Sequence, residues 1–384
     1  MRKNFLFALS SLVGVIIGAG IFGIPYAISK SGVIPGLFYF LILGGAVLLL
    51  YLFVGEIVLR TEGKLRLIGY AQKYLGNSGK VFITISTVLG LWGALLAYII
   101  LGGDFLKIVI SSILPSASGV PSFYFALFFS IFLSFFVFQG MKFIAPLELF
   151  TNTLFFFIVF FVFCFGSPKI NFQNFDLANV KNLFLPYGVI LFSLAGWTSI
   201  PEIADILKSP EERKKLKKVI IFAMTISIFI CLLFSFTIVG ISGKNTSFEA
   251  LQGLVPYLGP KVIFFGAIAA VITLADSFLI LGLSSRNTLL YDYKIPKKTA
   301  ALISCGIPLV LFLAGLRNFI GIIGTVGTII GAIEGIVIIF IFKNAKKLSD
   351  RNPEYNLNIP SFIFYFLVLV FILGAVLQFF PSLN

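Results

Sequence analysis

The first apolar stretch of the chain holds a cluster of helix-weakening residues, Gly18-Ala19-Gly20-Ile21-Phe22-Gly23-Ile24-Pro25-Tyr26. Glycine destabilises a helix interior, and proline lacks the N–H group that each helix turn needs. In a bilayer, unpaired backbone groups occur only where they are buried in protein or line a cavity. Close packing through Gly-x-x-x-Gly pairs is one explanation. That packing needs a small residue at every fourth position, so we favour a broken helix whose free N–H groups bind a ligand.

A second cluster of the same kind is Phe192-Ser193-Leu194-Ala195-Gly196-Trp197-Thr198-Ser199-Ile200-Pro201-Glu202. Small and polar residues again stand in the middle of an apolar span and are followed by proline. Free N–H groups near Ala19 to Gly23 suit a carboxylate, helped by the positive end of a helix dipole. Free carbonyls near Phe192 to Ala195 suit an ammonium group. A site with both ends fits a zwitterion, so an amino acid is the expected substrate.

Asp276 is an acidic residue within an apolar span, where an ionisable group is costly unless it is paired or functional. It lies about ten residues, or about 15 Å of helix, before Arg286, which places it near the middle of the bilayer. Thr273 and Ser277 stand one helix turn apart beside it. Three interpretations remain open: a sodium site at Thr273 and Ser277, with or without Asp276; an Asp276 carboxylate that titrates; and a structural acid.

Other residues in the apolar spans give weaker signals. Glu334, in a glycine-rich span, is expected to line the inner part of a cavity. Glu56 and Glu202 lie near span ends, where structural ion pairs with loop Lys or Arg residues are expected. Trp92 and Tyr98 line the pocket or face lipid, and the abundance of aromatic residues gives no basis for choosing.

These residues are set in a chain of 384 residues that is 59% hydrophobic and 11% charged. No soluble core needs so large an apolar share, so we predict an all-α membrane protein. The apolar runs predict eleven transmembrane helices. They lie near residues 5–29, 34–59, 81–103, 121–139, 146–166, 183–206, 218–240, 261–285, 298–315, 318–342 and 359–380.

Basic residues predict the orientation of these helices. Most of the 29 Lys and Arg residues fall in alternate loops, which the positive-inside rule assigns to the cytoplasm. We therefore expect a multi-pass protein of the cytoplasmic membrane with its N-terminus inside and its C-terminus outside. The loop 60–80 mixes basic and apolar side chains and predicts a short amphipathic helix on the inner leaflet.

The two broken helices predict an internal repeat. They are the first and sixth spans, five apart, so they have opposite directions in the membrane. Interrupted helices at matching positions of two halves are typical of secondary transporters built from inverted repeats. We expect a single transmembrane domain, 1–384, with a first repeat at 1–166, an inverted second repeat at 183–342 and an additional helix at 359–380.

Composition excludes several classes of function. The chain has no histidine, which removes His-based zinc, haem and triad chemistry, and its three cysteines have no Cys-x-x-Cys spacing. The net charge of +14 comes from short loops, so it does not indicate nucleic-acid binding. We expect no enzyme activity and no cofactor beyond a coupling Na+ or H+. The expected partners are an amino acid and the lipid bilayer, and the oligomeric state is open.

The glycine cluster at 18–26 resembles the helix 1 signature of the amino acid–polyamine–organocation superfamily, closest to its aromatic amino acid permease and amino acid/auxin permease branches. The segments Gly196-Trp197-Thr198-Ser199-Ile200-Pro201-Glu202, Leu207-Lys208-Ser209-Pro210 and Leu290-Tyr291-Asp292-Tyr293-Lys294-Ile295-Pro296-Lys297 are similar to its later patterns. This resemblance implies a LeuT-type fold, a 5+5 inverted repeat with broken helices 1 and 6, and alternating access. It also implies amino acid uptake driven by H+ or Na+.

The resemblance also implies a residue-level site. The carboxylate-binding loop falls on Gly18, Ala19, Gly20, Ile21 and Gly23. The amino-group loop and aromatic gate fall on Phe192, Ser193, Ala195, Gly196 and Trp197. Many relatives carry a helix 5 lysine in place of a sodium ion, whereas 146–166 offers Glu148, Thr151, Asn152 and Thr153 instead. The coupling ion is therefore left open.

We interpret the chain as a secondary active amino acid transporter, with the substrate between the two helix breaks. Its alternatives are an ion-independent exchanger and a non-transporting membrane sensor. A channel is disfavoured because no selectivity-filter sequence is present. A membrane enzyme is disfavoured because no cluster of carboxylates or histidines stands at a membrane face.

Overall fold

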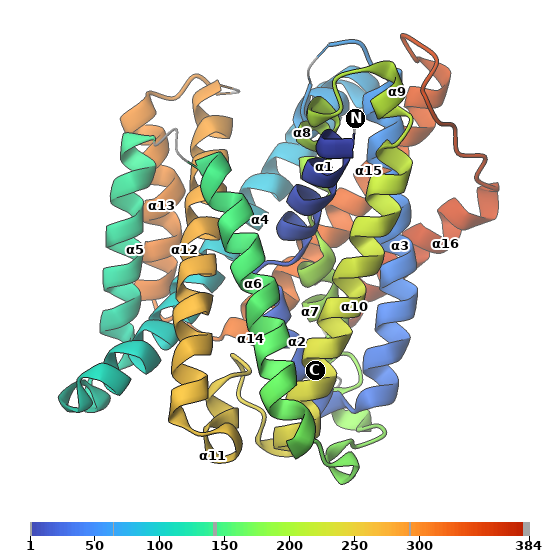
Figure 1. Cartoon of the computed structure of the whole chain (residues 1–384). Coiled ribbons are helices and arrows are strands. Elements are labelled where there is room, and N and C mark those ends of the chain that lie inside the picture. The colour runs from blue at the N-terminus through green and yellow to red at the C-terminus, as the bar shows by residue number, and fades with distance from the viewer. Residues whose placement is uncertain (1, 64, 141–143, 292, 379–384) are drawn as a thin grey trace.

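The computed structural model describes residues 2–63, 65–140, 144–291 and 293–378, which form helices joined by loops, with no strand among them (Figure 1). The principal helices are α1 (Arg2–Ile16), α2 (Gly20–Ser31), α3 (Val33–Arg60), α4 (Leu67–Ile113), α5 (Ser122–Gln139), α6 (Ile144–Gly166), α7 (Leu185–Leu194), α8 (Ile200–Ile206), α10 (Leu216–Ser242), α12 (Pro260–Tyr291), α13 (Lys297–Leu313), α14 (Phe319–Thr325), α15 (Gly331–Lys347) and α16 (Ser361–Leu377). Shorter helical elements include η5 (Trp197–Ser199), the π-helical η8 (Val326–Ile330), α9 (Pro210–Arg213) and α11 (Val255–Leu258); of these, η5 and η8 bear on the site.

Helical structure coincides with each predicted apolar span, but not every helix is long enough to cross a membrane. Among the described residues, seven helices are long and apolar enough to cross a membrane, or eight when the bent pair α1–α2 is one span. Shorter apolar helices include Thr153–Lys169 and Ser361–Leu377. The protein is thus a multi-pass helical membrane protein, and the count of eleven crossings stays a prediction, as do the repeat boundaries.

The loop expected to carry an amphipathic helix is part of a longer element. It forms the first section of α4, and Gly76 interrupts the helix with φ 72°. Leu67, Tyr70 and Tyr74 are all buried in the protein, and Asn344 Nδ2 of α15 donates to the Tyr74 carbonyl over 2.9 Å. The apolar side chains of this short helix therefore pack on the protein, and its position at the inner leaflet stays a prediction.

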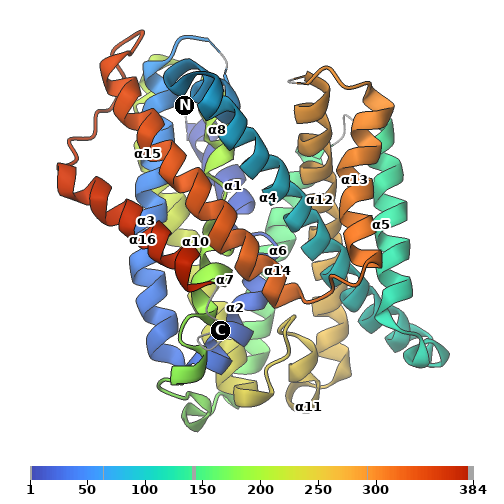
Figure 2. The same ribbon diagram turned by 180° about the vertical axis from the view of Figure 1, so that it is seen from behind.

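Broken helices α1–α2 and α7–α8 occupy the middle of the molecule in both views (Figures 1 and 2). Phe22 of α2 illustrates how α2 is held there. Its ring packs edge-on against Phe105 of α4 at 5.0 Å, Phe155 of α6 at 6.1 Å and Phe234 of α10 at 5.9 Å. Each such aromatic pair adds about 0.5–1.5 kcal/mol beyond the burial of area. Four helices are thereby fixed around one side chain.

The outside of the bundle is apolar. Large side chains such as Leu41, Phe128, Phe160 and Phe362 are each more than 60% exposed. A continuous apolar exterior of this kind belongs in lipid rather than in water. Helices α5, α12 and α13 stand together at one side of the molecule (Figure 2).

The predicted structural ion pairs at the helix ends are present. Glu56 accepts from Arg60 over 2.8 Å, and the Glu56 side chain is completely buried. Glu202 accepts from Arg66 over 2.6 Å in a half-exposed position. These two acids therefore hold helix ends in place, as the sequence indicates.

Candidate functional site

The break in the first span is short and lies just before Gly20. α1 ends at Ile16 and α2 begins at Gly20, and the two meet at an angle of 51°. The N–H groups of Ile21 and Phe22 bond back to the carbonyls of Gly18 and Ala19, at 3.4 and 3.2 Å. Because Gly20 is the first residue of α2, its own N–H has no acceptor within that helix. The break is narrower than the sequence suggests, since Gly23 and Pro25 continue the helix.

The break in the sixth span exposes carbonyl groups. α7 ends at Leu194, and Ala195 and Gly196 separate it from η5. The Phe192 carbonyl accepts from the Ala195 N–H over 3.2 Å, and the Leu194 carbonyl accepts from the Tyr51 hydroxyl over 3.1 Å. Within the part of the chain that the structure describes, no donor reaches the carbonyls of Ser193 or Ala195. Those two oxygens are available to a ligand.

Glycine brings the two breaks into contact. A Cβ atom at Gly20 would lie 2.3 Å from Ser193 Oγ and 2.7 Å from Ser193 Cα. Only glycine allows the start of α2 to approach the end of α7 so closely. Gly20, whose N–H has no acceptor within α2, thus lies beside the end of the helix whose carbonyls the other break leaves open.

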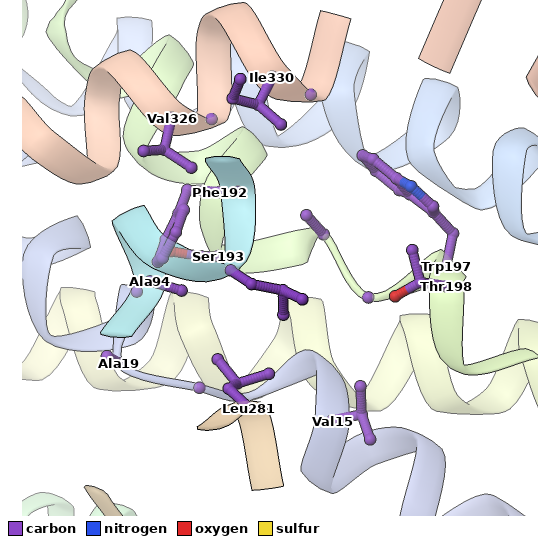
Figure 3. Close-up of a pocket in the computed structure, with 18 of the residues that line it drawn as sticks. Val15, Ala19, Ala94, Phe192, Ser193, Trp197, Thr198, Leu281, Val326 and Ile330 are labelled. Carbon is purple, nitrogen blue, oxygen red and sulfur yellow. The ribbon is translucent and has the colours of Figure 1, made fainter. Parts of the chain in front are cut away.

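A cavity of about 180 Å³ lies between the breaks, α4, α12 and the segment η8–α15 (Figure 3). Its wall is largely apolar, and Phe192, Ala94, Leu281, Val326 and Ile330 reach it from four different elements. The volume is below the ~300–1,000 Å³ of pockets for drug-sized ligands. It is therefore of a size for one small molecule such as a single amino acid.

Most of the predicted substrate residues line this cavity. They are Gly18, Ala19, Gly20, Phe192, Ser193, Ala195, Gly196 and Trp197. Ile21 and Gly23 are not among the lining residues: Ile21 is buried, and a Cβ at Gly23 would lie 2.6 Å from Ile323 Cδ1. The predicted role of the ten residues in binding substrate stays a prediction.

Trp197, predicted as an aromatic gate, is a buried part of the wall. Its Nε1 donates to Glu334 Oε2 over 2.8 Å, and its ring packs edge-on against Tyr51 at 6.3 Å. Thr87 of α4 donates to the other oxygen, Glu334 Oε1, over 3.0 Å. Glu334 therefore lines the cavity, as expected, and connects three elements there.

A smaller cavity of about 70 Å³ adjoins the first. Its wall consists of Gly14, Val15, Gly18, Tyr98, Asp276, Ser277, Ile280 and Leu281. Asp276 is buried, and its Oδ2 accepts from Thr151 of α6 over 2.6 Å. Its Oδ1 is buried without a hydrogen-bond partner among the described residues. A buried, unpartnered carboxylate oxygen is costly and is suited to a cation or a proton.

The other residues predicted for ion coupling take different positions. Ser277 shares the small cavity with Asp276 and Tyr98. Thr273 is turned to its own helix, where Oγ1 donates to the Ala269 carbonyl over 2.9 Å. The side chains of Glu148 and Asn152 lie outside the described residues.

Sequence reasoning missed two residues of the site, Thr87 and Tyr51, and left the position of Tyr98 open. Tyr98 lines both cavities and approaches the Ala19 backbone, whereas Trp92 lines neither. Thr87 and Tyr51 gave no signal, because a threonine or tyrosine in an apolar span is common. Their roles depend on neighbours that are distant in sequence.

Comparison with known proteins gives consistent results. A family model described as "Transmembrane amino acid transporter protein" matches residues 1–382. None of the curated proteins matches the chain. Similar solved structures include MhsT in complex with L-phenylalanine, with a TM-score of 0.66, 15% identity and 99% of each chain covered. They also include Mhp1, a nucleobase-cation-symport-1 family transporter in a closed conformation with bromovinylhydantoin bound, with a TM-score of 0.64, 15% identity, and 98% of this chain and 91% of that chain covered. At this identity the likeness shows the fold alone, and it confirms the predicted LeuT-type fold.

Proposed function

Because this chain belongs to the family of transmembrane amino acid transporter proteins, we propose that it is an ion-coupled symporter that carries amino acids by alternating access. The substrate occupies the cavity between the two helix breaks. One observation carries the proposal: Gly20, at the start of α2, lies in close contact with Ser193, at the end of α7, and both residues line the same small cavity.

Each end of an amino acid has a matching partner in that cavity. The carboxylate is held by the N–H of Gly20 at the start of α2, where the helix dipole favours negative charge. The ammonium group donates to the open carbonyls of Ser193 and Ala195. The side chain lies against Phe192 and the other apolar residues of the wall, which favours substrates with an apolar or aromatic side chain.

The coupling ion occupies the adjoining cavity at Asp276 and Ser277. The unpartnered Oδ1 of Asp276 supports this placement, because an oxygen with no donor is free to hold a cation or a proton. Gly18 borders both cavities, so an ion there stabilises the same break that binds the substrate. Na+ and H+ are both consistent with a carboxylate and a hydroxyl at this position.

The transport cycle follows from the positions of the breaks. The halves α7 and α8 move relative to the rest of the bundle, and Phe192 or Trp197 closes over the substrate before the site opens to the cytoplasm. In this proposal the protein lies in the cytoplasmic membrane with its N-terminus inside and its C-terminus outside. The loop lysines and arginines support that orientation.

The test is uptake of a radiolabelled amino acid mixture into proteoliposomes, with Na+ and pH gradients imposed separately. Accumulation under either gradient is the expected result and identifies the ion. Counterflow without gradient-driven accumulation assigns the protein as an exchanger instead. Absence of both uptake and counterflow, in protein whose Tm and elution volume are those of a folded preparation, overturns the amino acid assignment.

A further inference from the structure

Glu334 is a buried carboxylate that the proposed substrate and ion sites leave without a role. It lies on α15 at the wall of the central cavity, and 7% of it is exposed. Trp197 and Thr87 donate to its two oxygens, one each. Both donors are neutral, and among the described residues no Lys or Arg forms an ion pair with Glu334.

The two hydrogen-bond partners of Glu334 differ in whether they can accept as well as donate. An indole N–H only donates, whereas a threonine hydroxyl either donates or accepts. When the carboxylate is ionised, Trp197 and Thr87 both donate to it. When a proton sits on Oε1, the Thr87 hydroxyl turns to accept it, and Trp197 still donates to Oε2. Glu334 therefore gains or loses a proton without losing either hydrogen bond.

Asp276 and Glu334 differ in how many of their carboxylate oxygens accept a hydrogen bond. One oxygen of Asp276 is open to a cation, since its Oδ1 has no partner among the described residues. Both oxygens of Glu334 are occupied by donors. Each of those oxygens keeps a second lone pair, but among the described residues no group of three or more His, Cys, Asp or Glu side chains could hold a metal ion. A proton needs only the one carboxylate. The chemistry that fits Glu334 is proton binding.

Few charged groups face Glu334 from the helices packed on α15. From α3, Tyr51 lies behind the Trp197 ring, and Glu56 is already paired with Arg60. The segments η8 and α16 contain no charged residue. An ionised Glu334 is thus without a counter-charge, which a dry pocket disfavours and entering water stabilises.

The remaining charges lie farther along the same helices or are engaged elsewhere. On α4, Tyr98 lines the same cavity, and Lys80 stands about two turns before Thr87, which is ~10 Å of helix. On α15, Lys343 lies over the ring of Phe364, 4.8 Å from its centre. Beyond η5, Glu202 of α8 is paired with Arg66.

We propose that Glu334 is a proton-binding latch between α15, the broken sixth span and α4, which holds its proton while the cavity is closed and releases it when water enters. The proton leaves Oε1 for a water molecule in the opened cavity and leaves a carboxylate with both donors in place. This inference rests on the proposed transport function, because it names a residue where a proton enters and leaves the cycle.

The first test needs no substrate. The chain has two tryptophans, so Trp92→Phe leaves Trp197 as the sole indole. The substitution breaks no hydrogen bond of the described residues, because the indole N–H of Trp92 has no partner among them. In that background the emission of Trp197 should change with pH as one proton leaves its acceptor, Glu334. The titration should disappear with Glu334→Gln and persist with Glu62→Gln, since Glu62 is exposed. A titration that survives Glu334→Gln, or no titration in the parent, overturns the proposal.

The second test measures transport in the same proteins. A proton coupled one to one permits up to about tenfold accumulation for each unit of pH gradient. Glu334→Gln should lose the effect of the pH gradient and keep counterflow. Thr87→Val should shift the midpoint of the Trp197 titration, and Thr87→Ser, which keeps the hydroxyl, should restore it. Uptake in Glu334→Gln that still follows the pH gradient overturns the coupling role.

The two proposals fail separately. If the fluorescence titration is present and depends on Glu334 while no variant shows counterflow, the latch stands and the amino acid assignment fails. If counterflow is present and neither fluorescence nor uptake depends on Glu334, transport stands and the latch fails. Melting temperatures of all variants identify any protein that has not folded.

Discussion

The contact between the two helix breaks makes Gly20→Ala the most informative single substitution. The added Cβ would lie 2.3 Å from Ser193 Oγ and 2.7 Å from Ser193 Cα. Carbon atoms pack favourably at about 3.5–4.0 Å. Rotating the serine side chain relieves the first contact but not the second, because Cα belongs to the backbone. α2 and α7 must therefore separate by about 1 Å at the substrate site.

Such a separation affects stability and binding together. Overpacking of a close contact costs about 1–3 kcal/mol. At the site the same displacement moves Gly20 N–H away from the Ser193 carbonyl, so the two ends of a zwitterion no longer fit at once. A loss of about 1.4 kcal/mol lowers affinity tenfold. We expect binding to weaken by about tenfold or more, and Gly20→Leu to abolish it.

The assay is equilibrium binding of the identified amino acid to purified protein, with thermal unfolding recorded on the same samples. Gly45→Ala is the matched control, because no heavy atom lies within 4 Å of a Cβ at that position of α3. It introduces the same methyl group without a clash. If Gly20→Ala binds substrate and unfolds like Gly45→Ala, the breaks are not in contact and the proposed site is wrong.

Three further substitutions test other parts of the molecule. Asp276→Asn should make uptake independent of the ion gradient while counterflow remains; gradient dependence that is unchanged makes Asp276 structural. Tyr51→Phe leaves the buried Leu194 carbonyl without its donor and should cost about 1–3 kcal/mol, seen as a lower Tm. The hydrogen bond from Lys73 lowers the pKa of Asp350 from its usual 3.8. The stabilisation from Asp350 is therefore present at neutral pH and lost as pH falls through the lowered pKa, so the Tm difference between wild type and Asp350→Asn should vanish in acid.

Local sequence was sufficient to locate the helix breaks. Glycine and proline act on the backbone at their own positions, so Gly18 to Gly20 and Ala195 to Gly196 could be placed without knowing their neighbours. The same reasoning overextended the first break, because Gly23 packs on Ile323 within a continuous helix. The family and the fold could be predicted for the same reason, because two broken spans are a pattern that can be read along the chain, and the comparisons confirm both.

Contacts between distant segments were out of reach of that reasoning. The hydrogen bond from Trp197 to Glu334 joins residues 137 positions apart, and no local signal predicts it. In the structure Trp197 is a wall residue with its N–H engaged by Glu334, and its role as a gate stays a prediction. The burial of Tyr70 and Tyr74 in the protein was also out of reach, because amphipathicity identifies an apolar face but not what covers it.

The π-helical turn η8 determines the direction in which the side chains of α15 point relative to those of α14. A π turn takes in one residue more than an α turn, and one residue of an α-helix corresponds to about 100° of rotation. If the same residues of Val326–Ile330 were wound as α-helix, Glu334 would be rotated by about that angle relative to α14, away from Trp197. The wider π turn, rather than any one side chain, thus determines whether this carboxylate meets the indole of the sixth span.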